Sequence, residues 1–387
     1  MVGNNITPAR SARVPSLDGL RAVSAAMVVF GHAVKLLQVG RHLPYGAGVA
    51  DAWGPVGVTV FFVISGFLIT RLLIEESRAS GSISFRGFFA RRAFRILPAY
   101  WTYLAVVAAL ASAGLVTASA PGFGRAFFFS TDYLNSDSWV LNHSWSLSVE
   151  EQFYLFWPVL LLVVGTLRAR KTALALIVVA PALRVLTYFV APDLRPCITS
   201  MLHLRVDALM VGCWAALEME LRPRSRWLAL LAHRRAALSS AVYCILVSAV
   251  MRRFGLLHSA VGYSIEAFCA CAVLLWAMRN STSRAGRVLN SRPMVHLGAI
   301  SYSLYLWQQL WFSHEGRSPV WIVPLLIAGA VISAELSYRF VEAPMLRLRT
   351  KLRVALPADP GAAASYAEDA GPPMAFPVAR SATTSMP

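Results

Sequence analysis

Ten separate stretches of this chain are apolar for long enough to cross a lipid bilayer. A bilayer core of about 30 Å needs about 20 apolar residues per helix. The stretches lie at 17–37, 53–75, 98–118, 145–165, 172–190, 200–220, 236–251, 258–278, 295–313 and 319–341. They do not show the polar–apolar alternation of membrane barrel strands. The sequence therefore predicts an all-α, polytopic integral membrane protein with about ten transmembrane helices.

The composition excludes several other classes of protein. Apolar residues make up 57% of the 387 residues and charged residues only 14%, whereas charged residues reach about 25% in soluble domains. A disordered chain, a fibrous repeat and an ordinary soluble enzyme are therefore excluded. The five cysteines form no C-x-x-C pair, so we expect neither a disulfide framework nor a zinc site, and no bound metal or cofactor.

The basic residues predict the orientation in the membrane. The net charge is +17, and if the N-terminus is cytoplasmic, 25 Lys and Arg fall on the cytoplasmic side against 7 outside. Positive residues favour the cytoplasmic side, so both termini are predicted to be cytoplasmic, in the cell membrane. This use of the charge requires no nucleic-acid partner. We predict a polar N-terminus at 1–16, a transmembrane domain at 17–345 and a disordered tail at 346–387, which is poor in periodic apolar residues.

Arg21 and His32 share the first apolar stretch, LDGLRAVSAAMVVFGHA. Their separation of 11 residues is close to three helical turns, which places them on one face and roughly 16 Å apart along the axis. Ionisable groups inside a bilayer are candidates for function. An arginine suits a phosphate, and a histidine suits general-base catalysis near neutral pH. The alternative for His32 is a hydrogen bond between helices.

Two adjacent carboxylates, Glu150 and Glu151, lie inside the apolar segment HSWSLSVEEQFYLFW. If Trp145 marks the outer surface, Glu150 lies at a depth similar to that of His32. One carboxylate could then orient His32 or stabilise its charged form. The alternatives are that one of them neutralises an arginine or stays protonated.

Other polar residues in apolar segments are candidates for a substrate cavity. Arg205 and Asp207 are two residues apart in HLRVDALMVG and point to opposite faces of a helix, so each is expected to pair with another helix. Ser65 lies near mid-membrane in FFVISGFLIT, where Gly66 favours close helix packing. Tyr302 belongs to the polar helix face of LGAISYSLYLWQ, which either lines a cavity or bonds across helices.

Three arginines, Arg91, Arg92 and Arg95, lie in the interfacial segment ISFRGFFARRAFRIL on the cytoplasmic side. They could receive a phosphorylated ligand or hold lipid headgroups. With Arg21, they mark a cytoplasmic opening, and the histidine and carboxylates lie deeper. Such a path suits a long ligand with phosphates at one end and a reactive group at the other, which is the shape of acyl-CoA.

The chain resembles the membrane acyltransferase 3 family through an ordered series of motifs. They are LDGLRA with the histidine eleven residues after its arginine, FFVISGFLIT, RRAFRILPAYW, WSLSVEEQFYLFWP, RVDAL, ISYSLYLWQ and SYRFVEAP. The resemblance implies an O-acyltransferase in which Arg21 and His32 serve acyl-donor binding and catalysis. Gln308 departs from the family pattern, which often has histidine there, so no acid–base role is expected at position 308.

Within this family, the length and Arg-rich composition look like the macrolide O-acyltransferases of actinomycete antibiotic clusters. The first expectation is therefore transfer of a short acyl group, acetyl or propionyl, from acyl-CoA to a macrolide hydroxyl in an actinomycete. O-acetylation of a cell-envelope or exported glycan is an alternative, and a small-molecule permease is another. The expected partners are acyl-CoA, a hydroxylated acceptor and the lipid bilayer, with no obligate protein partner.

Overall fold

The computed structural model describes residues 14, 16–39, 52–133, 138–312 and 320–355. No strand occurs within these ranges. The longer helices are α1 (Leu17–Val39), α3 (Trp53–Ser80), α4 (Phe85–Ser112), α7 (Ser144–Val190), α8 (Leu202–Leu221), α13 (Tyr263–Arg279), α16 (Ser301–Trp311), α17 (Val323–Ser337) and α18 (Ala343–Ala355). The shorter helices are α5 (Ala120–Phe127), α6 (Trp139–Asn142), α9 (Arg226–Leu231), α10 (Arg234–Val242), α11 (Ser248–Arg252), α12 (Gly255–Leu257), α14 (Arg284–Leu289) and α15 (Arg292–Ala299).

Wider or tighter turns join several of these helices. A 3₁₀ helix at Pro192–Thr199 precedes α8, and another at Val320–Ile322 precedes α17. π-helical turns lie at Tyr243–Val247, His258–Gly262 and Tyr338–Glu342. The first of these joins α10 to α11 and the second joins α12 to α13, so each pair forms one long apolar helix.

The protein is an all-α, polytopic membrane protein, as predicted. In the described ranges, eight helices are long and apolar enough to cross a membrane. Two features account for the difference from the ten predicted stretches. The fourth and fifth stretches lie in one helical segment that is broken at Gly165, where φ is 73°. The ninth stretch is divided at Ile300 between α15 and α16, each too short to span alone.

The chain reverses direction at Gly165. Before Gly165, α7 runs parallel to α3, since Ser65 bonds Glu150 and Thr70 bonds Trp157. After Gly165, α7 runs antiparallel to α8. A glycine readily adopts the positive φ that the reversal requires.

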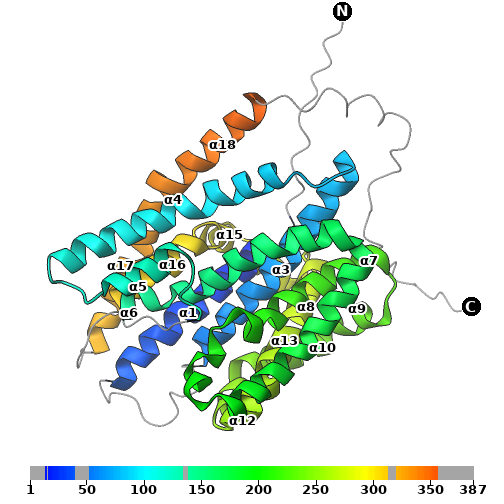
Figure 1. The fold of residues 1–387 in the computed structure, drawn as a ribbon, viewed down its shortest axis with the longest axis horizontal. Helices are drawn as coiled ribbons and strands as arrows, with labels where there is room; N and C mark the ends of the chain where they lie inside the picture. Colours follow the sequence, from blue (N-terminus) through cyan, green and yellow to red (C-terminus); the bar gives the residue numbers. More distant parts are fainter. Residues whose placement is uncertain (1–13, 15, 40–51, 134–137, 313–319, 356–387) are drawn as a thin grey trace, which may run out of the picture. The chain divides into compact units, whose positions relative to one another are not determined.

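Helix α3 contacts both α1 and α8 (Figure 1). Gly66 of α3 and Gly212 of α8 allow the close approach: a Cβ on Gly66 would overlap the carbonyl oxygen of Leu209, and one on Gly212 that of Val63. The packing predicted for Gly66 is therefore confirmed. Helix α16 contacts α1, and it also contacts α17. These contacts bring the polar residues of α1, α3, α7 and α16 together.

The compact unit ends at Leu346, and a second unit begins at Arg347. Helix α18 continues to Ala355, so the first part of the segment expected to be a disordered tail is helical. Its leucines, arginines and lysine are good helix formers, which explains the difference. The rest of that tail, 356–387, and residues 1–13 and 15 of the predicted polar N-terminus lie outside the described residues.

Candidate active site

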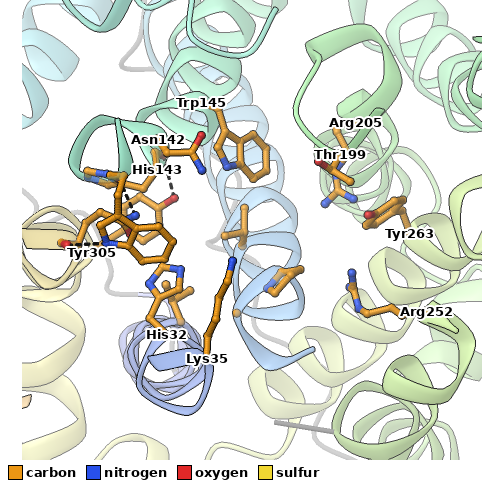
Figure 2. A pocket seen from close by; sticks show the side chains of 16 residues that line it. His32, Lys35, Asn142, His143, Trp145, Thr199, Arg205, Arg252, Tyr263 and Tyr305 are labelled. Carbon is orange, nitrogen blue, oxygen red and sulfur yellow. Dashed lines mark hydrogen bonds between the residues drawn. The ribbon is translucent and has the colours of Figure 1, made fainter. Parts of the chain in front are cut away.

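A cavity of about 300 Å³ lies against His32, between helices that are distant in sequence. We call this the His32 cavity. Its wall includes Trp139 of α6, His143 and Trp145 at the start of α7, Arg205 of α8, Tyr263 of α13 and Tyr305 of α16. Figure 2 shows His32, His143 and Tyr305 on one side, and Arg205, Tyr263 and Arg252 on the other. Lys35, which lies almost one helical turn beyond His32 in α1, also reaches the cavity.

Gln308 holds His32 in a defined orientation. The Nδ1 atom of His32 lies 2.7 Å from Oε1 of Gln308. The Nε2 group of Gln308 donates to the carbonyl oxygen of Tyr305 and to Oε1 of Gln309, both at 3.3 Å. These two acceptors fix the position of the Gln308 amide nitrogen. The Gln308 Oε1 atom therefore faces His32 and accepts a hydrogen bond from the Nδ1–H group of His32. The basic nitrogen of neutral His32 is therefore Nε2.

Two reciprocal hydrogen bonds between Trp139 and Gln309 stabilise the cavity wall next to His32. Trp139 Nε1 donates to the carbonyl oxygen of Gln309 at 3.1 Å, and Gln309 Nε2 donates to that of Trp139 at 2.8 Å. The Trp139 ring lies 5.4 Å from the His32 ring and 5.3 Å from Lys35 Nζ. The Lys35 ammonium thus lies over the face of the indole in a cation–π contact, and the His32 ring lies edge-on to it.

His143 is a polar residue of the cavity that the sequence analysis did not single out. It is 4% exposed, and neither ring nitrogen has a hydrogen-bond partner among the described residues. Its ring packs edge-on against Tyr103 at 5.3 Å and lies 5.6 Å from Tyr305. Its position two residues before the WSLSVEEQ motif is the sequence feature that could have identified it as a site residue. An unpartnered buried imidazole at a cavity is available to a substrate hydroxyl.

Glu150 lies in a second polar cluster, which also contains Ser65 and Tyr154. The Oγ atom of Ser65 donates to Glu150 Oε1 at 2.8 Å, and the Tyr154 hydroxyl donates to Oε2 at 3.2 Å. The guanidinium of Arg92 lies 5.2 Å from the Tyr154 ring. The charges of Arg21 and Arg92 both act on Glu150. The structure thus places Glu150 with a serine, a tyrosine and arginines, and Gln308 makes the contact to His32 that the sequence analysis gave to a carboxylate.

Other residues predicted for catalysis, donor binding or the substrate cavity have different surroundings. Arg21 is half-buried and is within electrostatic range of Glu150 and of Arg95. Glu151 has a buried oxygen, Oε1, without a hydrogen-bond partner in the described residues. Tyr302 donates to the backbone of α4 at Ile96, at 3.0 Å. Arg91 is paired instead with Glu76.

Arg205 and Asp207 face different partners, as their spacing requires. Asp207 accepts two hydrogen bonds from Arg184 at 3.0 Å, and both side chains are fully buried. Arg205 donates to Thr59 at 3.0 Å and lines the His32 cavity. Asp207 and Tyr302 are not among the lining residues, whereas Trp145 and Arg205 are. Within the described ranges, no group of His, Cys, Asp and Glu could hold a metal.

A comparison with protein families matches residues 14–339 to the acyltransferase 3 family, described as an acyltransferase domain. The chain belongs to the acyltransferase 3 family. The matched acyltransferase domain contains the Arg21–His32 pair of the sequence analysis. No solved structure matches the chain.

Two relatives of this chain are bacterial proteins that are named as O-acetyltransferases. It is 28% identical over 372 residues to the "Putative peptidoglycan O-acetyltransferase YrhL" of Bacillus subtilis, covering 86% of this chain and 55% of that protein. It is 27% identical over 376 residues to the "O-acetyltransferase OatA" of Staphylococcus aureus, covering 90% of this chain and 60% of that protein. The chain thus spans little more than half the length of these relatives. Neither is named for a macrolide.

Proposed function

We propose that this acyltransferase moves an acetyl group from acetyl-CoA to a hydroxyl of a cell-envelope glycan. The observation that carries the proposal is His32, whose basic Nε2 is set by Gln308 at a cavity large enough for part of a sugar chain. The names of the relatives favour a glycan acceptor over the macrolide that the composition suggests. A bacterial cell membrane fits the same relatives.

The donor enters at the Arg21 end of α1. Arg21, Arg92 and Arg95 are close enough to act on one another or on Glu150 electrostatically. Their guanidinium groups suit the phosphates of CoA. The pantetheine arm then extends along α1 toward His32, which lies roughly 16 Å farther along the helix. The positive-inside rule places this entrance on the cytoplasmic side.

The acceptor hydroxyl lies in the His32 cavity during transfer. His32 Nε2 removes its proton as the oxygen attacks the thioester carbonyl, and the new C–O bond forms. The C–S bond then breaks, and the CoA thiolate receives the proton from the imidazolium. The Gln308 oxygen accepts from Nδ1–H throughout, so the ring keeps its orientation. The group transferred is the acetyl alone, and no oxidant or metal takes part in this sequence.

The test is transfer of radiolabelled acetyl from acetyl-CoA to glycan fragments by the protein in proteoliposomes. We expect His32→Gln to lower kcat by about 10²- to 10⁴-fold, the usual contribution of a general base, with donor affinity unchanged. We expect Arg21→Ala to weaken acetyl-CoA binding about tenfold or more, because a charge-assisted hydrogen bond is lost.

The matched control is His203→Gln. His203 is exposed, pairs with Tyr133 and does not line the cavity, so this variant should keep wild-type activity. Full activity in His32→Gln would refute the proposed chemistry. Passage of an unmodified solute across the vesicles, with no acetyl transfer, would instead support a permease.

A further inference from the structure

The lining of the His32 cavity carries three positively charged side chains. These are Lys35, Arg205 and Arg252, and the described lining residues include no aspartate or glutamate. In Figure 2, Arg205 and Arg252 lie on either side of Tyr263, across the cavity from His32. The aromatic ring is 3.9 Å from the Arg205 guanidinium and 5.6 Å from that of Arg252.

Arg205 has hydrogen-bonding capacity that the protein does not use. Its side chain is 1% exposed, and within the described residues only Nη2 donates a hydrogen bond, to the Thr59 hydroxyl. The Nε and Nη1 atoms are buried and have no partner among the described residues. Buried charged groups are normally paired, because desolvation without a partner is unfavourable. Two unused N–H directions beside a cavity therefore point to an anionic ligand.

The carboxylates near Arg205 are already engaged elsewhere. Asp207 is bonded to Arg184 and to Ser264. Glu266 accepts from Arg252, His258 and Ser248. Both act on Arg205 electrostatically, but neither forms an ion pair with it. Arg184, in contrast, is held by Asp207, Ser264 and two backbone carbonyls. Arg184 is thus a structural cation, and Arg205 is a cation left available to the cavity.

We propose that Arg205, with Lys35 and Arg252, forms a subsite for an oxyanion carried by the acceptor, so that the enzyme selects acidic glycans. The inference rests on the proposed function, because it concerns the acceptor of that reaction. The planar Arg205 guanidinium, whose N–H groups at Nε and Nη1 have no partner in the described residues, can donate hydrogen bonds to the oxygens of a carboxylate or phosphate. The sugar ring then spans the cavity, with the oxyanion at Arg205 and the reacting hydroxyl at His32.

The first experiment measures binding to the protein in lipid nanodiscs by calorimetry. Three probes are compared: N-acetylmuramic acid, its methyl ester, and N-acetylglucosamine 1-phosphate. We expect the carboxylate or the phosphate to bind about tenfold more tightly than the neutral ester. Tighter binding of only one acid identifies which oxyanion the subsite takes. Equal binding of all three probes, or no binding of any, would overturn the proposal.

Variants then assign the preference for an anionic probe to these cations. Arg205→Gln should remove the preference for the acid, and Lys35→Gln, at an exposed position, should reduce it without disturbing the core. Arg205→Lys keeps the charge but loses the planar fork, so it should keep only part of the preference. Arg253→Gln is the control, because Arg253 is exposed and outside the lining. A preference that survives in Arg205→Gln would refute the subsite.

Acetyl transfer to the same probes separates this proposal from the proposed function. Anion-selective binding that depends on Arg205, without acetyl transfer to any probe, would refute the function and keep the subsite. Transfer to the acid and to its ester with the same kcat/KM would keep the function and refute the subsite.

Discussion

His32 on α1 and Gln308 on α16 are 276 residues apart in sequence, and their side chains meet at 2.7 Å beside the cavity. The Gln308 side chain accepts from His32 through Oε1, and its two amide hydrogens are directed to Tyr305 and Gln309. Position 308 therefore sets the tautomer of the proposed base, although an amide cannot itself move a proton at neutral pH.

Gln308→Met and Gln308→Glu test this contact as a matched pair. Methionine has a similar length but no acceptor oxygen, so we expect it to lower kcat about 3- to 10-fold, the effect of losing a hydrogen bond of about 0.5–1.5 kcal/mol. Glutamate keeps the acceptor and should retain most of the activity. Steady-state kinetics with saturating acetyl-CoA are the measurement. An unchanged kcat in Gln308→Met would contradict the positioning role.

His143→Phe tests whether the second histidine serves the substrate or the fold. Phenylalanine keeps the ring contacts with Tyr103 and Tyr305 and removes two buried nitrogens that have no described partner. We expect kcat/KM for the glycan to fall about tenfold, whereas thermal stability in detergent should stay equal or rise, since an unsatisfied buried polar group costs about 1–3 kcal/mol. A lower Tm with unchanged kcat/KM would instead indicate a structural role.

Because the Arg184–Asp207 pair is buried, we expect the free energy of unfolding to differ strongly between single and double variants of the pair. Asp207→Leu leaves a buried arginine without its main partner and should lower the free energy of unfolding by about 3–5 kcal/mol. Combining it with Arg184→Met should restore most of that loss. Denaturation in mixed micelles is the measurement, and the exposed i,i+4 pair Arg71–Glu75 is the control, with an expected effect below about 1 kcal/mol. Equal losses in the single and double variants would argue against a structural pair.

Gly66→Ala tests the close approach of α3 and α8. The added methyl group would overlap the Leu209 carbonyl oxygen, and overpacking of this kind costs about 1–3 kcal/mol. Because Ser65 is the adjacent residue and bonds Glu150, we also expect weaker acetyl-CoA binding. Gly124→Ala, where a Cβ meets nothing within 4 Å, should have no such effect. Wild-type stability and donor binding in Gly66→Ala would show that the two helices can separate without consequence.

The local sequence pattern is sufficient to predict how two residues of the same helix are placed relative to each other. The 11-residue spacing of Arg21 and His32 lies within one helix, where periodicity alone determines the shared face. The i,i+2 spacing of Arg205 and Asp207 likewise predicted different partners, and the structure has Thr59 and Tyr263 for one, and Arg184 for the other. Such inferences need only helical geometry and the cost of placing charges in an apolar medium.

Local sequence patterns are therefore enough to assign the membrane-spanning, all-helical class, the acyltransferase motifs and the residues on each helix face. Tertiary structure decided which faces meet. Gln308 rather than a carboxylate contacts His32, His143 joins the cavity, and Arg205 is left without a carboxylate of its own. These outcomes depend on the packing of α1, α3, α7, α8 and α16, and on the chain reversal at Gly165. Periodicity describes a single helix, but the angle and register between two helices come from the fit of all their side chains together.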